Sequence, residues 1–361
     1  MRATAIEQLD NQQELIKCVP MFPSTRFQGS KLKIVDWIWD SVKQLDFVSA
    51  LDLFGGTGSV GYMLKQKGKI VTYNDILKFN WYIALALIEN DDSQLLPDDI
   101  NFILNQHEGI EYPTFIQETF RDIYFTDEEN IWIDIVAANI RKIDDIYKKA
   151  IAYFALFQSC ISKRPFNLFH RKNLYLRKSN VKRNFGNKAT WDTPFDVHFR
   201  RFAKEANLAV FTNGKKNRSL NVDAFDVMGN YDLIYIDTPY ISPKGIGIDY
   251  LSFYHFLEGV VDYEHWPEMI NNRTKHKSLK GQDSMATWTD KKRIHEAFDR
   301  LFQKFSNSIL VVSYRSDGIP SVEELLRLLN KYKQNIREVK RKNYKYVLST
   351  NHSEEILLIG T

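Results

Sequence analysis

One short segment limits the folds open to this chain: an apolar run that leads directly into a glycine turn. Residues 48–54 read VSALDLF, and glycines follow in the spacing Gly56-x-Gly58-x-x-Gly61. A buried strand that turns sharply into a helix favours such glycines, because glycine adopts left-handed backbone conformations without a steric penalty. The spacing alone is a weak signal for a nucleotide site, since any tight strand-to-helix turn can use it.

The segments around this turn alternate between strand and helix patterns. SVGYMLKQKG (59–68) has apolar residues at helical spacing and ends on glycine, and KIVTYND (69–75) reads as a second strand that closes on a carboxylate. Further strands are predicted at 208–213, 231–237, 307–314 and 354–360. Strands that alternate with helices predict an α/β fold with a parallel sheet.

The middle of the chain interrupts this alternation. Residues 91–205 contain long helical patterns and then a stretch rich in basic and aromatic side chains. The simplest account is a discontinuous catalytic domain, 1–90 and 206–361, with a mainly helical target-recognition module, 91–205, inserted between its halves.

Charge is distributed unevenly along the chain, although the net charge is only +4. Between residues 163 and 218 there are 15 Lys or Arg against three acidic residues, whereas 98–149 holds 12 acidic residues against five basic ones. This asymmetry predicts one strongly positive face of the kind that binds nucleic-acid phosphates. A solvated, lysine-rich loop is the alternative.

Composition argues against several other classes of protein. No run approaches the roughly 18 apolar residues that span a bilayer, and the first residues lack the apolar core of a signal peptide. We therefore expect no membrane contact and a cytoplasmic location. Cys18 and Cys160 stand far apart, which gives neither a disulfide framework nor a metal-ligand spacing. No metal site is expected.

Two carboxylates discriminate between the ligands that a glycine turn can hold. Asp75 lies 19 residues after Gly56, a spacing that suits the ribose hydroxyls of either a dinucleotide or S-adenosylmethionine. Asp52, just before the turn, would repel a pyrophosphate at the helix N-terminus. The same carboxylate suits the cationic groups of S-adenosylmethionine, so the pattern Asp52-x-Phe54-x-Gly56-x-Gly58 favours a methyl donor.

The stretch IYIDTPYI (234–241) supplies a second motif. An apolar strand leads to Asp237-Thr238-Pro239-Tyr240 at its carboxyl end, where open α/β sheets place their chemistry. A strand that closes on an Asx-Pro turn would explain this stretch taken alone. Together, D-x-F-x-G-x-G and D-T-P-Y resemble the motifs of the DNA N6-adenine methyltransferases, in particular the Dam-like family.

Three further stretches resemble that family, in the family's order along the chain. PSTRFQGSK (23–31) is similar to its N-terminal cofactor motif, and FYHFLEGV (253–260) is similar to the helix after its catalytic loop. FQSCISKRPFNLFHRKNLYLR, with NFGN after it, resembles the basic and aromatic stretch that leads into the family's DNA-contacting hairpin. The chain departs from the family at Thr238, where Pro is commoner, and at NLFHR, which replaces an Asn-Gly-Leu-x-Arg run.

The resemblance and the residues together imply transfer of a methyl group from S-adenosylmethionine to a flipped-out adenine in double-stranded DNA. The catalytic residues would be Asp237, Thr238, Pro239 and Tyr240. The Asp237 carboxylate and the Thr238 carbonyl would accept hydrogens of the adenine amine, and the Tyr240 ring would stack on the base. Cofactor contacts would come from Phe27, Lys31, Asp52, Phe54, Gly56, Gly58, Asp75, Asp223, Phe225 and Asp237. DNA contacts would come from Arg164, Arg171, Lys172, Arg177, Lys178, Lys182 and Arg183, with Arg171 and Arg177 as candidates for reading bases.

Other functions stay open at the level of sequence. A methyltransferase for cytosine N4, RNA adenine or a protein glutamine amide would share much of this chemistry, although cytosine N4 enzymes usually carry Ser where Asp237 stands. A catalytically silent DNA-binding homologue and an oxidoreductase are alternatives from other classes. A role in a restriction-modification system would make a restriction endonuclease with the same site a candidate partner. The protein is expected to act as a monomer or a weak dimer.

Overall fold

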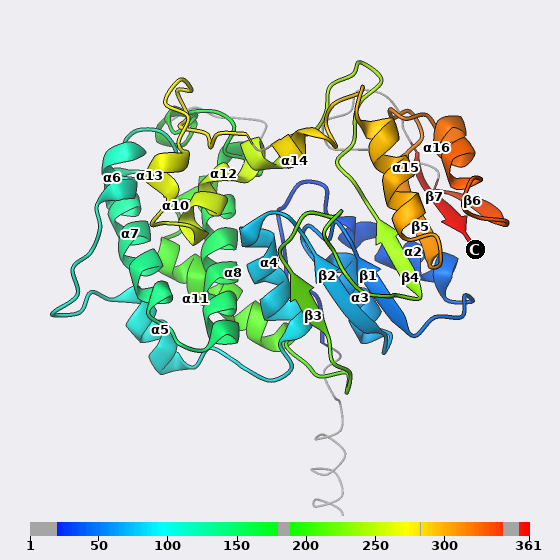
Figure 1. The fold of residues 1–361 in the computed structure, drawn as a ribbon. Helices are drawn as coiled ribbons and strands as arrows, with labels where there is room; N and C mark the ends of the chain where they lie inside the picture. Colours follow the sequence, from blue (N-terminus) through cyan, green and yellow to red (C-terminus); the bar gives the residue numbers. More distant parts are fainter. Residues whose placement is uncertain (1–19, 180–187, 282, 342–353) are drawn as a thin grey trace, which may run out of the picture.

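A seven-stranded sheet forms the centre of the computed structural model, which describes residues 20–179, 188–281, 283–341 and 354–361 (Figure 1). The strands are β1 (Ser49–Asp52), β2 (Ile70–Asn74), β3 (Arg218–Leu220), β4 (Leu233–Ile236), β5 (Ile309–Arg315), β6 (Ile336–Arg341) and β7 (Glu355–Gly360). Their order in the sheet is β3-β2-β1-β4-β5-β7-β6. The predicted α/β class is confirmed.

The sheet is not parallel throughout, which corrects the expectation from the sequence. Strands β1 to β5 pair in parallel, whereas β7 lies antiparallel between β5 and β6. The strand predicted at 208–213 is also wrong. A helix continues to Ala209, because Ala203, Ala206 and Ala209 form one buried helical stripe, and the edge strand is instead the short, partly exposed β3.

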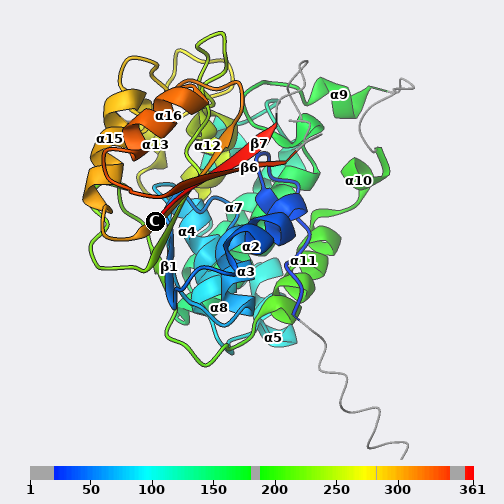
Figure 2. The same cartoon turned by 90° about the vertical axis from the view of Figure 1, so that its right-hand side faces the viewer.

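Different helices cover the two faces of the sheet, because successive strand residues point to opposite sides. Ala50 and Val311 pack on the face covered by α2, α3 and α4, whereas Leu51 and Val312 pack under α15 and α16. Figure 2 views the β6–β7 edge and shows these layers on either side of the sheet. The bounds of these helices are α2 (Val35–Val42), α3 (Ser59–Gln66), α4 (Lys78–Ala84), α15 (Ile294–Lys304) and α16 (Val322–Leu329).

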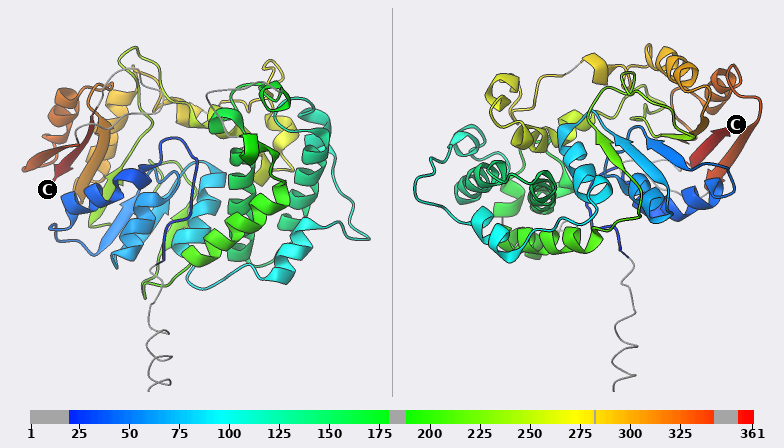
Figure 3. Two further views of the ribbon diagram at one scale, coloured as in Figure 1. Left: turned by 180° about the vertical axis from the view of Figure 1, so that it is seen from behind. Right: turned by 60° about the horizontal axis from the view of Figure 1, so that its bottom comes forward.

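The segment 91–205 is helical and lies beside the sheet (Figure 3). Its helices are α5 (Pro97–Leu104), α6 (Phe115–Thr119), α7 (Asp127–Arg141), α8 (Ile146–Ser162), α9 (Tyr175–Lys178), α10 (Lys188–Asp192) and α11 (Phe195–Ala209). The long α8 is buried from Ala150 to Ser162 and packs against both α11 and α4. Phe157 of α8 meets Phe79 of α4 edge to face at 5.7 Å. One continuous apolar core therefore joins the helical segment to the sheet.

Two helices from the second half of the chain complete this helical part. They are α12 (Tyr250–Val261) and α13 (Trp266–Met269), and the ring of Phe120 contacts Phe256 and Trp266 at 5.1 and 5.0 Å. A side chain at Gly259 would collide with Trp266, because a Cβ there would lie 1.9 Å from the indole ring. The division into 1–90 with 206–361 and 91–205 stays a prediction, with α12 and α13 packed on the helical side.

None of the helices in the described ranges combines the length and the apolar character needed to cross a membrane. Within the same ranges, no group of three His, Cys, Asp or Glu side chains is placed to hold a metal ion.

Candidate active site

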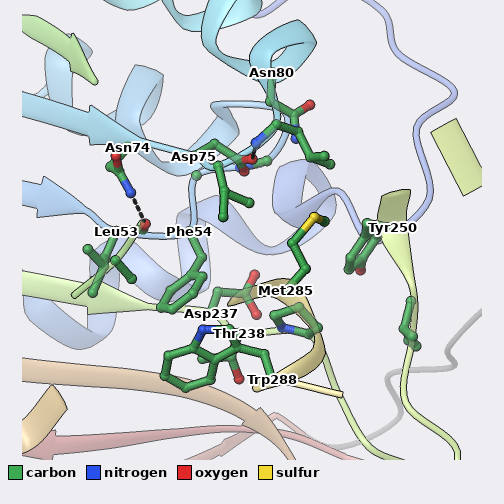
Figure 4. A pocket seen from close by; sticks show the side chains of 18 of the residues that line it. Leu53, Phe54, Asn74, Asp75, Asn80, Asp237, Thr238, Tyr250, Met285 and Trp288 are labelled. Carbon is green, nitrogen blue, oxygen red and sulfur yellow. Dashed lines mark hydrogen bonds between the residues drawn. The ribbon is translucent and has the colours of Figure 1, made fainter. Parts of the chain in front are cut away.

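A cavity of about 210 Å³ lies where β1, β2 and β4 end, at the carboxyl edge of the parallel strands (Figure 4). Parallel strands bring residues from distant parts of the chain together at this edge. The cavity is lined by most of the residues predicted from the motifs: Phe27, Lys31, Asp52, Phe54, Gly56, Asp75, Asp223, Asp237, Thr238 and Pro239. Gly58, Phe225 and Tyr240 do not line it.

The glycine turn has the geometry that its sequence predicts. Gly56 and Gly58 have φ angles of 51° and 76°, in the left-handed region, and Gly58 directly precedes α3. The Gly56 N–H points back across the turn and donates to Asp75 Oδ2 at 2.9 Å. Gly58 shapes the turn but does not line the cavity, so its contact with a cofactor stays a prediction.

Burial perturbs the two carboxyl groups at this turn. It raises the pKa of Asp52 to about 7, although the Gly61 N–H donates to this carboxylate at 2.9 Å and favours its charged form. Burial also raises the pKa of Asp75 to about 6, against hydrogen bonds from the N–H groups of Leu77 and Gly56. With Asp237, three buried acidic groups share a cavity whose described lining contains one ammonium, that of Lys31. Such a cavity attracts a cationic ligand.

Asp237 follows β4 directly, and its two carboxylate oxygens differ in their hydrogen-bond partners. Oδ1 lies 3.0 Å from Lys31 Nζ and accepts a hydrogen bond from Tyr240 Oη at 2.7 Å. No donor from the described residues reaches Oδ2, and the side chain keeps 16% of its surface exposed. Burial raises the pKa of Asp237 to about 6, the charge of Lys31 lowers it, and the charge of Glu355 raises it.

Glu355, the first residue of β7, is a part of the site that sequence reasoning missed. Its side chain is fully buried, and Oε1 lies 3.2 Å from Lys31 Nζ and 3.0 Å from Tyr240 Oη. The Ser313 hydroxyl donates to the same oxygen. Lys31 and Tyr240 thus each bridge Glu355 and Asp237. The only signal in the sequence is an acidic residue at the start of an apolar strand, EILLIG, which does not indicate a partner.

The position of Tyr240 corrects the expectation that its ring offers an open face for a base. The residue is 5% exposed, and its ring packs edge to face against Tyr314 at 5.2 Å. Its hydroxyl is held by the buried network of Lys31, Asp237 and Glu355, which draws the ring away from the cavity. Tyr240 therefore contributes through its hydroxyl in this structure.

Other apolar side chains form the cavity wall. Figure 4 shows Phe54, Met285 and Trp288 around it, with Tyr250 on the opposite side. Met285 belongs to α14 (Asp283–Ala286). Phe225, expected beside a bound adenine, stacks behind Trp288 at 5.7 Å with 19° between the planes and supports this wall from outside. No sequence motif contains Met285, Trp288 or Tyr250, so local patterns do not predict their place in the site.

Two predicted DNA contacts are structural, and the sequence prediction is wrong for them. Arg164 is 1% exposed, and its guanidinium donates to the main-chain carbonyls of Leu168, Tyr124 and Arg171. Arg177 is paired in a bidentate manner with Glu129, at 2.8 and 2.6 Å. Both guanidinium groups are buried and held by acceptors inside the protein, so neither is presented to a phosphate or a base.

The remaining predicted DNA contacts divide into three groups. Arg171 and Lys172 are exposed and take part in no ion pair within the described part of the chain. Lys178 is exposed but lies 3.3 Å from Asp122. Lys182 and Arg183 lie outside the described residues. The acidic segment 98–149 thus neutralises part of the basic stretch, because the two segments fold against each other.

The fold and this site define a methyltransferase: an open α/β sheet with an acidic cavity at its carboxyl edge, and Asp237, Thr238 and Pro239 of the D-T-P-Y motif in the cavity wall. The chain belongs to the D12 class N6 adenine-specific DNA methyltransferase family, whose model matches residues 27–317. It is an adenine-specific DNA methyltransferase of that class.

Proteins similar to this chain are named as Type II methyltransferases or modification methylases. It is 28% identical over 320 residues to the Type II methyltransferase M2.HphI of Haemophilus parahaemolyticus, covering 86% of this chain and 89% of that protein. It is 26% identical over 327 residues to the Type II methyltransferase M.FokI of Planomicrobium okeanokoites, and 25% identical over 329 residues to the modification methylase StsI of Streptococcus sanguinis. These matches cover 85% and 84% of this chain but only 47% and 45% of those two proteins.

Proposed function

We propose that the protein uses S-adenosylmethionine to methylate N6 of an adenine at a specific site in double-stranded DNA, as the modification enzyme of a restriction-modification system. The observation that carries this proposal is the Asp237 carboxylate. One oxygen is fixed by Lys31 and Tyr240, and the other has no donor from the described residues in a cavity lined by the D12 motifs.

The cavity fits S-adenosylmethionine in charge and in shape. Asp52 suits its cationic groups, and Asp75 suits its ribose hydroxyls. Phe54, Met285 and Trp288 give its adenine an apolar wall. When bound, this cofactor supplies an electrophilic methyl group on a positively charged sulfur. The lining holds more buried carboxylates than ammonium groups. It therefore favours the positively charged S-adenosylmethionine over a dinucleotide with its negatively charged pyrophosphate.

The residues of the D-T-P-Y loop would activate the adenine amine. This amine is a poor nucleophile, because its lone pair is delocalised into the ring. Asp237 Oδ2 and the Thr238 carbonyl would accept its two hydrogens and favour a pyramidal nitrogen. The N6 lone pair would then be free to take up the methyl group, the sulfur would leave as a neutral thioether, and N6 would release one proton to Asp237 Oδ2 or to water. Positioning and electrostatics supply the acceleration.

Lys31 would keep Asp237 ionised for this role. A cation 3.0 Å from the carboxylate lowers the pKa that burial raises. The amine reaches the cavity only after the base leaves the duplex, which costs a few kcal/mol. With Tyr240 buried, we assign the stacking face for that base to Tyr250, whose ring lines the cavity (Figure 4). Arg171 and Lys172 remain the proposed DNA contacts of the predicted basic stretch.

Methylation of unmodified genomic DNA by the purified protein tests this proposal. Single-molecule sequencing after incubation with S-adenosylmethionine is expected to show N6-methyladenine in one sequence context. The matched control is Asp237→Ala, which should leave no modified base while it still binds duplex DNA. Modified cytosine, or adenine methylated only in RNA, would contradict the proposal. A restriction endonuclease that cleaves the unmodified site is the candidate partner, and the oligomeric state stays a prediction of monomer or weak dimer.

A further inference from the structure

The segment between α13 and α14 forms a tight hairpin, Ile270–Lys280, here named the basic hairpin. Ile270 and Leu279 pair as an antiparallel bridge, and the Asn271 N–H donates to the Ser278 carbonyl at 2.7 Å. The Thr274 hydroxyl accepts from the Ser278 N–H at 2.9 Å and ties the tip together. The bridge and these hydrogen bonds thus hold the tip of the hairpin in a defined conformation.

The basic hairpin carries positive charge and no acidic residue. Its sequence, INNRTKHKSLK, contains Arg273, Lys275, Lys277 and Lys280 and neither Asp nor Glu. None of the ion pairs within the described ranges includes any of these four side chains. Lys277 Nζ donates to Asn272 Oδ1 at 3.0 Å, and Lys280 Nζ donates to the main-chain carbonyl of Glu268 at 2.7 Å, so both meet neutral acceptors.

This arrangement differs from the basic stretch that the sequence singled out. There, Glu129 pairs with both Lys163 and Arg177, and Asp122 pairs with Lys178. Side chains that already hold a carboxylate have less to gain from a phosphate. The exposed side chains of Arg273 and Lys275 have no ion-pair or hydrogen-bond partner among the described residues. The positive charges of these two side chains are therefore available to an anion outside the protein.

The basic hairpin leads along the chain into the wall of the cavity. The chain runs from Lys280 directly into Gly281 and Met285, which line the cavity. Figure 1 shows the hairpin (yellow) at the same end of the molecule as α14 and the loop that follows β4. A strand of DNA that delivers a base to the cavity would therefore pass close to the hairpin.

The basic hairpin is also joined to the exposed Arg171 and Lys172. Tyr124 Oη lies 2.7 Å from the His276 carbonyl, and the carbonyl of Tyr124 accepts a hydrogen bond from Arg164. Arg164 in turn donates to the Arg171 carbonyl at 3.0 Å. The buried Arg164 thus holds two basic segments next to each other, one from each half of the chain.

We infer that the basic hairpin is a phosphate-binding element of the DNA interface, outside the predicted 91–205 module, that holds the DNA backbone next to the extruded base. This inference rests on the proposed function. Lysine and arginine side chains neutralise backbone phosphates without reading sequence, so the contact would strengthen binding to all duplexes alike. Specificity would remain with residues that reach base edges.

The test compares the salt dependence of duplex binding between matched double variants. Arg273→Gln with Lys275→Gln removes two exposed charges that hold no partner in the described structure. The control, Lys43→Gln with Lys331→Gln, removes two exposed charges that pair with Asp40 on α2 and with Asp299 on α15. Binding of a mixed-sequence duplex of about 20 base pairs is titrated by fluorescence anisotropy across a salt series. Each lost phosphate contact should flatten the log–log slope by about 0.9.

We expect the hairpin variant to flatten the slope by about 1 to 2, whereas the control retains the wild-type slope. The KM of the hairpin variant for DNA should exceed the wild-type KM most at low salt, where counterion release contributes most, and approach it as the salt concentration rises. An unchanged slope in a variant with a wild-type Tm would overturn the inference while leaving the methyltransferase activity intact. A wild-type protein that neither binds nor methylates duplex DNA would overturn the proposed function and the inference with it.

Discussion

The buried network around Asp237 predicts opposite effects for two neighbouring substitutions. Glu355→Gln keeps the size and the hydrogen-bond acceptor of the side chain but removes its negative charge. Lys31→Met keeps most of the length of the side chain but removes its positive charge. The charge of Glu355 raises the pKa of Asp237 and the charge of Lys31 lowers it. The first variant should therefore lower the pKa of Asp237, and the second should raise it.

The magnitude follows from the geometry of the network. Asp237 Oδ1 and Glu355 Oε1 lie 2.7 and 3.0 Å from the same Tyr240 hydroxyl oxygen. The two carboxylate oxygens are therefore within about 6 Å of each other, and at an effective dielectric constant of about 20 their repulsion amounts to about 3 kcal/mol. Since about 1.4 kcal/mol corresponds to one pH unit, removing the charge should move the titration by about one to two pH units.

The assay is the pH dependence of kcat/KM, which reports ionisations of the free enzyme. The ionised Asp237 carboxylate is a much stronger hydrogen-bond acceptor than the protonated carboxyl group, so the wild-type rate should fall below a pH near the Asp237 pKa of about 6. Glu355→Gln should move this acidic limb to lower pH, and Lys31→Met should move it to higher pH. Glu354→Gln, a change at the neighbouring position outside the network, is the matched control. Shifts of both variants in the same direction, or a shift in the control alone, would refute the reasoning.

Three further substitutions test other parts of the structure. Tyr240→Phe should lower kcat about 10- to 100-fold, because a hydrogen bond to a charged group contributes about 1.5–3 kcal/mol; a ring that only stacked on the base would leave steady-state rates unchanged. Asp52→Asn should abolish detectable S-adenosylmethionine binding in calorimetry but stabilise the free protein above pH 7. Folding raises the pKa of Asp52 to about 7, so ionisation of Asp52 destabilises the folded state increasingly from about pH 4 upward, by up to about 4 kcal/mol. Urea titrations in which the Asp52→Asn variant gains more unfolding free energy at pH 5 than at pH 8 would contradict this argument. Arg177→Met should lower the free energy of unfolding by about 1–3 kcal/mol, because Glu129 keeps Lys163 as a partner, and should leave the salt slope of DNA binding unchanged; a flatter slope would show that Arg177 reaches the DNA.

Local patterns in the sequence predict which residues meet at the carboxyl edge of the sheet. Recognisable apolar strands end at Asp52 or lie just before Gly56, Asp75 and Asp237, and parallel strands carry such residues to one edge whatever surrounds them. The left-handed angles at the glycine turn likewise follow from local sterics. Local patterns were sufficient wherever the chemistry lies at the end of a strand.

The partners of the individual charged side chains depend on tertiary packing. Glu355 lies more than 300 positions after Lys31, and it joins the site because β7 inserts antiparallel beside β5, a pairing that periodicity does not encode. Arg177 is paired with Glu129, and Tyr240 is turned into the core by Lys31 and Glu355. A local pattern shows which residues carry charge or rings. Whether they face an external ligand depends on which partners the fold brings within hydrogen-bond distance, because a buried charge must be compensated by the protein itself.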